Sequence, residues 1–449
     1  MDIPSRKDGR GFIERSTLPH EVVSALSIPK SQHRYTSLWR HVIYWLAVIG
    51  PGLMVMLADT DAGSIITAAQ SGAQWKYALL LPQLLLIPIL AIVQEMTVRL
   101  GVVTHKGHGE LIRQHFGMRW AVVSVVTLFL AAVGALVTEF AGIAGVGEML
   151  HISPWISVPL VTVLLIWIGV SGSYRRVERV GIAVGLLELL FLPAAFLVHP
   201  NAGQIARALT NVPLQNGNYL FLLAANVGAV IMPWMVFYQQ GAIVDKHLHG
   251  SQQLKIARWD TCLGAIVTQV VMIAVMVMVA ATIGQQNSGA SLQTIQDIAT
   301  GLQPTLGVVG AIVFCGLGMA GAGFLASLVV SLAGAWGIGE AFGLNHSLNL
   351  PFYKAKGFYI IYTLAHLGGA VLVLSGLSLV NLTVDIEVMN AILLPIVLGF
   401  LLALERVALP PERRMHGWHK LVAWGVSLLV IGFGLYMAGY VVLQPFLHF

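Results

Sequence analysis

Two acidic residues lie inside an otherwise apolar stretch near the start of the chain. Asp59 and Asp61 occur in residues 57–64, Leu-Ala-Asp-Thr-Asp-Ala-Gly-Ser. The glycine and small polar residues beside them favour an interrupted helix, whose freed backbone carbonyls could join the carboxylates in coordinating a cation. The alternative is a kinked helix whose acids pair with a neighbouring helix. This segment alone therefore predicts either a cation site or a structural kink.

A second interruption is predicted in residues 228–235, Gly-Ala-Val-Ile-Met-Pro-Trp-Met. Pro233 has no backbone N–H and clashes with the preceding turn of a helix, so carbonyls near Ala229 lose their usual partner. A proline kink flanked by methionines is also compatible with simple packing. Interrupted apolar segments at corresponding places in two halves of a chain, however, are the best sequence indication of a transporter site where two repeats meet.

Composition indicates what surrounds these segments. The chain has 449 residues, of which 57% are hydrophobic and 10% are charged, whereas about 25% of the residues of a soluble protein are charged. So few charges cannot cover the surface of the soluble domains that a chain of this length would form, which excludes an ordinary soluble enzyme. Cys262 and Cys315 lie in apolar runs, so neither a disulfide framework nor a zinc cluster is predicted.

Eleven apolar stretches are long enough to cross a bilayer, which takes roughly 20 residues. We predict an all-α integral membrane protein with spans at 43–72, 77–99, 120–147, 156–173, 181–198, 219–244, 260–283, 304–335, 357–376, 383–404 and 420–443. Residues 1–40 hold no continuous apolar core of the signal-peptide kind, so we expect a soluble tail there.

Basic residues divide unequally between the connections of these spans. With the N-terminus in the cytoplasm, every Lys and Arg except Lys76 and Arg207 lies in the tail or at the cytoplasmic side. This asymmetry follows the positive-inside rule. It predicts a plasma (inner) membrane protein with a cytoplasmic N-terminus and an external C-terminus. The basic excess thus reports topology and contact with anionic lipid, and no nucleic-acid partner is predicted.

Short motifs follow one another in a particular order along the spans. Residues 61–64 read Asp-Ala-Gly-Ser and residues 232–235 read Met-Pro-Trp-Met, with further strings at 50–52, 99–104, 174–178 and 258–261. Together they resemble the NRAMP (natural resistance-associated macrophage protein) family of divalent-metal transporters, whose first- and sixth-helix motifs are Asp-Pro-Gly-Asn and Met-Pro-His-Asn. The resemblance runs from residue 48 or so to the end of the tenth span.

The resemblance implies a leucine-transporter-like fold that works by alternating access. That fold is an inverted five-plus-five repeat with broken helices 1 and 6. We therefore expect a cytoplasmic tail at 1–40, a first five-helix repeat at 41–200, a second, inverted repeat at 201–405 and an extra C-terminal helix at 406–449. Gly63 and Pro233 are expected to mark the two helix breaks.

The family's metal site can be carried over residue by residue. The implied ligands are the Asp61 carboxylate, the Ser64 hydroxyl, the Ala229 carbonyl and the Met232 thioether. A further ligand, Glu387, is placed only by counting back from Leu394-Pro395.

Three of these residues bear on the choice of ion. Ser64 replaces an amide and leaves room for water, and Glu387 adds a second carboxylate; both changes favour Mg²⁺, which prefers oxygen ligands and keeps its waters. Met232 retains a thioether, which favours softer ions such as Mn²⁺ or Fe²⁺. Met232 as a packing residue in a widened cavity is the alternative.

Two departures bear on proton coupling. Trp234 replaces the family's sixth-helix histidine, and an indole cannot accept a proton near neutral pH. Of two family acids on the third helix, Glu139 is kept and the other falls on Gly142. Asp59 and Glu139 remain candidates for a proton or ion pathway.

This combination resembles the NRAMP-related magnesium transporters. It predicts transport of Mn²⁺ and/or Mg²⁺ with weak or absent proton coupling. The alternatives are a proton-coupled Mn²⁺/Fe²⁺ symporter of the standard NRAMP type and a sodium-coupled amino-acid carrier of the same fold.

The sequence contains neither a complete zinc-protease motif nor a phosphate-binding loop. His20-Glu21 lacks the second histidine of the zinc-protease pattern, and no phosphate-binding Gly-Lys-Ser/Thr loop occurs. We therefore predict neither an enzyme nor an ATP-driven pump, and no cofactor, because the divalent ion is the transported substrate. The expected partners are that ion and the lipid bilayer, without an obligate protein partner.

Overall fold

The computed structural model describes residues 49–449 except 287–288, 290, 377–378 and 448–449. Within these residues the chain is helical and contains no strand, so the predicted all-α architecture is confirmed. In chain order the helices are α3 (Pro51–Asp59), α4 (Ala62–Trp75), α5 (Leu80–Thr104), α6 (His108–Phe116), α7 (Met118–Met149), α8 (Pro154–Val170), α9 (Tyr174–Gly185), η1 (Leu186–Leu190), α10 (Phe191–Leu197), α11 (Ala202–Ala208), α12 (Gly217–Val230), α13 (Pro233–Asp245), α14 (Gly250–Ala281), α15 (Ile283–Gln286), α16 (Ile295–Ala311), η2 (Ile312–Leu317), α17 (Gly318–Phe342), α18 (Lys356–Leu374), α19 (Leu379–Val407), η3 (Pro411–Arg413) and α20 (Gly417–Leu447).

The membrane spans match the predicted set closely. In the part of the chain that the structure describes, nine helical segments are long and apolar enough to cross a bilayer, and the pair α3–α4, bent by 46°, makes a tenth. The shorter apolar helix α8 has 17 residues and fills the predicted span 156–173. Its start is fixed by Ser153, whose hydroxyl accepts a hydrogen bond from the Trp155 N–H, and by Pro154 in the first position.

Two predicted spans differ most from the structure at their starts. The span 304–335 begins inside α16, which is a separate helix started at residue 295 by a capping box between Thr294 and Asp297. Gly307, with φ of 73°, and the π-helical turn η2 separate it from α17. The seventh span is longer than predicted, because α14 starts at Gly250 and its first turns are polar.

Of the predicted domain limits, residues 1–40 lie outside the described residues. The limits 41–200, 201–405 and 406–449 stay predictions, since the described chain forms one structural unit.

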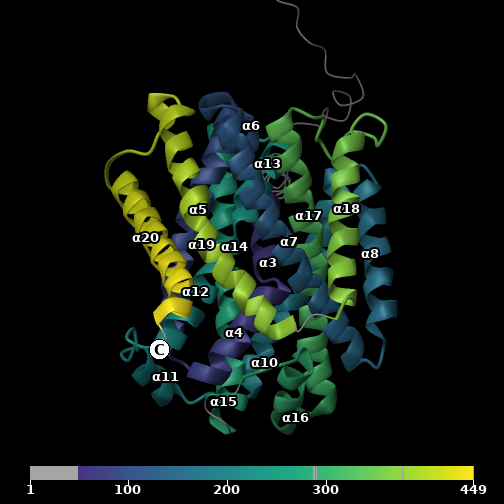
Figure 1. Ribbon diagram of the computed structural model, residues 1–449, viewed down its shortest axis with the longest axis vertical. Coiled ribbons are helices and arrows are strands. Elements are labelled where there is room, and N and C mark those ends of the chain that lie inside the picture. The colour runs from purple at the N-terminus through teal and green to yellow at the C-terminus, as the bar shows by residue number, and fades with distance from the viewer. Residues whose placement is uncertain (1–48, 287–288, 290, 377–378, 448–449) are drawn as a thin grey trace, which may run out of the picture. The chain divides into compact units, whose positions relative to one another are not determined.

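Close packing surrounds the broken helices (Figure 1). α4 packs against α12, α14 and α19, and α7 packs against α17 and α19. Glycines permit this approach, because a Cβ on Gly228 of α12 would collide with the backbone carbonyl of Glu387 on α19. Likewise, a Cβ on Gly142 of α7 would lie 2.5 Å from the Ala62 Cβ at the start of α4. The beginning of α4 is thus enclosed by α7, α12 and α19.

Candidate metal-binding site

Asp61 begins the second half of the broken first span. Helix α3 ends at Asp59 and α4 starts at Ala62, and Asp61 has an extended backbone between them. Its Oδ1 accepts a hydrogen bond from the Ser64 N–H at 2.7 Å, as is usual for an acidic N-cap. Its Oδ2 has no hydrogen-bond partner among the described residues. One carboxylate oxygen is therefore held by the helix and the other is free to bind.

Gly63 has a different role from the one predicted. The break lies at Thr60 and Asp61, whereas Gly63 belongs to the first turn of α4. A Cβ at Gly63 would lie 2.5 Å from Oε1 of Glu387 and 3.4 Å from Oδ1 of Asp61. The glycine therefore leaves the space in which two carboxylates approach the start of α4.

The sixth span breaks as the proline predicts. α12 ends at Val230, Ile231 and Met232 are not helical, and α13 starts at Pro233. In a continuous helix, the Ala229 carbonyl would accept from the N–H of residue 233, which proline lacks. The Ser64 hydroxyl donates to this carbonyl instead, at 2.9 Å. The structure thus joins the two broken spans directly through two of the predicted ligands.

Met232 and Trp234 form a contact that the sequence motif did not reveal. The Trp234 indole Nε1–H donates to the Met232 Sδ at 3.1 Å, and both side chains are fully buried. A hydrogen bond to a thioether is weak, since sulfur is a poor acceptor. The Met232 thioether is therefore held only by a weak donor, at the break of the sixth span.

Glu387 reaches the site from α19, as its spacing to Leu394-Pro395 predicted. The side chain is fully buried, and its Oε2 accepts from the Asn390 Nδ2 at 2.9 Å. Its Oε1, the atom beside Gly63, has no partner in the described part of the chain. Asn390 was not predicted; its position one helical turn after Glu387 is the only signal that could have identified it.

The two candidate pathway acids lie on different sides of the break. Glu139 of α7 is fully buried, and its Oε2 accepts from the Ala62 N–H at 3.0 Å, next to Asp61. Asp59 is also buried, and its Oδ2 accepts weak hydrogen bonds from Thr268 and Gln269 of α14, at 3.3 and 3.4 Å. Glu139 therefore contacts the α4 half of the site directly, whereas Asp59 faces α14.

Glu188 is an acid that sequence reasoning missed. It lies on η1, is fully buried, and neither carboxylate oxygen has a hydrogen-bond partner within the described residues. One turn earlier, Gly185 packs against Leu57 of α3, which brings η1 alongside the break. An acid inside the apolar span 181–198 was the signal, because such residues are rare in membrane helices.

The candidate site is closed to solvent and has few strong ligands. Asp61, Ser64, Ala229, Met232 and Glu387 all have zero exposed surface. Among the residues that the structure describes, no three His, Cys, Asp or Glu side chains converge as a metal cluster. Two carboxylates with a hydroxyl, a carbonyl and a thioether suit a passing ion better than a permanently bound one, since structural metal sites use a closed set of strong ligands.

A helical bundle with two half-helix breaks meeting at a buried acidic site has the architecture of secondary transporters. The family model described as Nramp, natural resistance-associated macrophage protein-like, matches residues 52–439. The chain therefore belongs to the NRAMP family.

Curated relatives match part of their length. The divalent metal cation transporter MntH of Staphylococcus haemolyticus is 29% identical over 283 residues, which cover 59% of this chain and 62% of the relative. MntH of Levilactobacillus brevis is 29% identical over 219 residues, 47% of this chain and 46% of the relative. The chain thus spans about half to three-fifths of the curated relatives it matches. Both relatives are named as transporters, in agreement with the prediction that the chain is not an enzyme.

Solved structures confirm the predicted fold. A mutant of the Eremococcus coleocola manganese transporter has a TM-score of 0.74 at 18% identity, covering 94% of this chain and 90% of that one. MhsT in complex with L-phenylalanine has a TM-score of 0.60 at 14% identity, covering 86% and 97%. These likenesses establish the leucine-transporter-like architecture with broken first and sixth spans, in an integral membrane protein.

Proposed function

We propose that this protein carries divalent metal cations, Mn²⁺ and/or Mg²⁺, across the membrane by alternating access, with weak or absent proton coupling. The observation that carries the proposal is the pair of unpartnered carboxylate oxygens, Asp61 Oδ2 and Glu387 Oε1, in a fully buried site. Two buried carboxylates without a basic partner need a positive charge, because an isolated buried charge costs several kcal/mol. A divalent cation supplies that charge.

The donor atoms support both ions. Asp61, Glu387, Ser64 and the Ala229 carbonyl offer hard oxygen ligands, which suit Mg²⁺ and Mn²⁺. The Met232 thioether adds a soft ligand that favours Mn²⁺. We therefore expect the oxygen set to bind both ions and the sulfur to set the preference between them.

A polar hollow lies at the C-terminal end of α4 and the N-terminal ends of α12 and α19. It has a volume of about 570 Å³, and its lining includes Gln70, Asn218, Ser291 and the exposed Asp385, two residues before Glu387. A carboxylate at the entrance raises the local concentration of cations. We assign this hollow to the external side of a plasma (inner) membrane, with the N-terminus in the cytoplasm, because the basic connections lie at the other end of the spans.

Proton coupling is the point on which two candidate functions differ. Trp234 occupies the histidine position, and its only polar hydrogen is donated to Met232, so it cannot relay a proton. Glu139, in contrast, contacts the α4 start at Ala62 and favours the second candidate, a proton-coupled Mn²⁺/Fe²⁺ symporter. Measuring internal pH during metal uptake distinguishes the two.

Flux into proteoliposomes tests the proposal. We expect uptake of Mn²⁺ and Mg²⁺ that Asp61→Ala and Glu387→Gln reduce at least tenfold, whereas Asp385→Asn, a matched change at the exposed entrance, reduces it less than threefold. Internal pH should follow that of protein-free vesicles. Full uptake by Asp61→Ala contradicts the site, and metal-driven acidification beyond the control contradicts uncoupled transport. Displacement of Mn²⁺ by amino acids in a binding assay would indicate the third candidate function, a sodium-coupled amino-acid carrier.

A further inference from the structure

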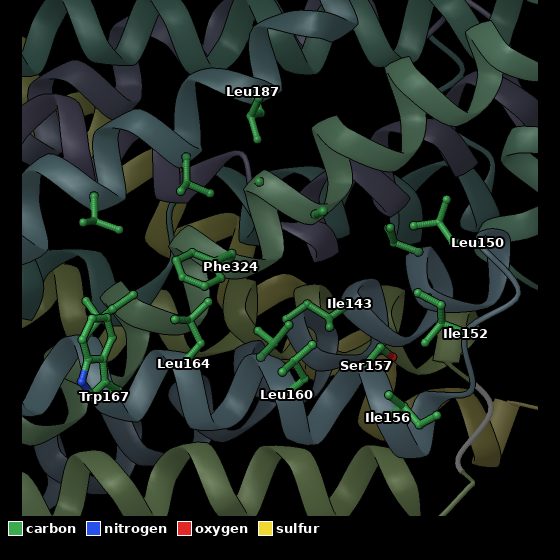
Figure 2. Close-up of a pocket in the computed structure, with 18 of the residues that line it drawn as sticks. Ile143, Leu150, Ile152, Ile156, Ser157, Leu160, Leu164, Trp167, Leu187 and Phe324 are labelled. Carbon is green, nitrogen blue, oxygen red and sulfur yellow. The ribbon is translucent and has the colours of Figure 1, made fainter.

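A long apolar groove lies between α8 and the helices α7, α9 and α17 (Figure 2). Its volume is about 680 Å³. Leu160, Leu164 and Trp167 of α8 form one wall, and Leu187 of η1 and Phe324 of α17 point into it from the opposite side. The groove is therefore a built feature of four packed elements rather than a gap along one helix.

The groove opens toward lipid. Leu160 and Trp167 on its outer wall are 67% and 71% exposed, and α8 is apolar except for Ser157 and Thr162. At 1.5 Å per residue, the 17 residues of α8 span roughly 25 Å, most of the ~30 Å hydrocarbon core of a bilayer. An extended hydrocarbon chain is the ligand whose shape and polarity fit this surface.

One end of the groove is polar and basic. Arg176, in the first turn of α9, lines the groove and is exposed, and its guanidinium makes no ion pair or hydrogen bond with any described residue. Ser171, the C-cap of α8, also lines it, and its hydroxyl has no partner in the described structure. A guanidinium and a hydroxyl at the end of an apolar channel match a phosphate headgroup, which arginine binds in a bidentate manner.

A second hollow adjoins the same end. It measures about 500 Å³ and is lined by Val163, Ile166, Trp167, Val170 and Ser171 of α8. Trp167 and Ser171 therefore border both hollows. Two apolar surfaces that meet near one unpaired guanidinium are complementary to a molecule with one anionic head and two hydrocarbon chains.

We propose that this groove is a binding site for a two-chain anionic phospholipid. Its phosphate contacts Arg176 and the Ser171 hydroxyl, one acyl chain lies in the groove and the other lies along the second hollow. The arginine lies in the basic first turn of α9, next to the α8–α9 connection, which the positive-inside rule assigns to the leaflet rich in anionic lipid. This proposal does not depend on which ion the protein carries.

The site's position connects it to the transport helices. Ile143 in the groove wall lies one helical turn after Glu139 on α7. Phe324 follows Gly323 on α17, and Gly323 packs against the backbone of Glu139. A bound acyl chain thus touches the outer surface of the two helices that support the metal site.

Lipid retention tests the proposal. The full-length protein is reconstituted in nanodiscs of dioleoyl phosphatidylglycerol and dioleoyl phosphatidylcholine in equal amounts, extracted with mild detergent, and the lipid bound per protein is measured by mass spectrometry. We expect about fivefold more phosphatidylglycerol than phosphatidylcholine, which corresponds to ~1 kcal/mol. Arg176→Gln should abolish this preference, whereas Arg175→Gln, a neighbouring exposed arginine outside the groove, should preserve it.

Groove filling provides an independent test that leaves the charge unchanged. Leu160→Trp should reduce retained lipid of both kinds, whereas Ile266→Trp, a lipid-facing residue of α14 outside both hollows, should not. A single-chain lysophosphatidylglycerol should be retained less than the two-chain lipid. Equal retention of both headgroups by the wild type, or the same loss in Arg175→Gln as in Arg176→Gln, would show ordinary annular lipid and overturn the proposal.

Discussion

Asp260 fixes the N-terminal end of α3, and its removal is expected to open the protein on its basic side. Its Oδ2 accepts from the Gly50 and Gly52 N–H groups at 3.0 and 2.8 Å, and its Oδ1 accepts from the Leu53 N–H at 3.2 Å. Asp260 lies on α14, so this cap ties one helix to another. A second tie joins Lys246 to the Ile49 carbonyl and to Glu178.

The size of the effect follows from these bonds. Hydrogen bonds to a charged group contribute about 1.5–3 kcal/mol each, and loss of an N-cap costs about 0.5–2 kcal/mol. Asp260→Asn keeps one acceptor oxygen but loses the charge and the second oxygen, so we expect a loss of ~2 kcal/mol from the closed arrangement. That shifts the ratio of closed to open protein by roughly 30-fold.

Cysteine labelling measures this shift. In a chain lacking Cys262 and Cys315, the buried Ala58 of α3 is replaced by Cys, and labelling by a membrane-impermeant maleimide is followed from the basic side. Asp260→Asn should accelerate labelling by more than tenfold. Asp297→Asn, which removes the carboxylate of the exposed α16 capping box, is the matched control. Labelling within twofold of the parent in a folded Asp260→Asn protein would refute the role given to the cap.

Three further outcomes are expected. Gly228→Ala should lower the stability measured in thermal melts by about 1–3 kcal/mol, because its Cβ would collide with the Glu387 backbone. Gly399→Ala, with open space around it, should not lower the stability. Equal melting temperatures of the two variants would contradict this packing. Met232→Ala should lower Mn²⁺ flux severalfold more than Mg²⁺ flux, and an equal loss of both would make the thioether a packing group. Burial lowers the pKa of His108 in α6 to about 4, below its value in the unfolded chain. The unfolded state therefore binds more protons between pH 6.5 and 4, and the free energy of unfolding decreases as the pH is lowered through this range, by up to ~1.4 kcal/mol per pH unit. A His108→Gln protein with the same pH slope in thermal melts would contradict this.

Hydropathy and local chain chemistry were sufficient to predict the spans and their two breaks. Pro233 removes a definite hydrogen bond, so the second break follows from one residue. At the first break, two acids beside a glycine favoured an interrupted helix but left a kinked helix as the alternative. Glu387 was placed by the family resemblance, through its distance in sequence from Leu394-Pro395. The structure brings it to Gly63.

Other features depend on contacts between helices that no local pattern specifies. The Asp260 cap joins α14 to α3, residues far apart in sequence. The hydrogen bond from Trp234 to Met232 depends on the turn at the break. Glu188 lies near the break of the first span only because η1 packs beside α3. The start of α16 is different, since the local pattern Thr294-x-x-Asp297 specifies its capping box, whereas hydropathy alone places the start of the span nine residues later.

The bond from the Ser64 hydroxyl to the Ala229 carbonyl has a kinetic consequence. A carrier without a co-transported ion must reverse its conformation after unloading, and this return step is slow when the bare ligand oxygens repel one another. Here the Ser64 hydroxyl donates its proton to the Ala229 carbonyl, so two of the proposed ligand oxygens are hydrogen-bonded to each other and join α4 to α12 without cargo. In the proposed carrier this hydroxyl–carbonyl pair therefore adds no repulsion to the return step, and the Asp61 and Glu387 carboxylates are the groups that still need a positive charge when the cargo has left.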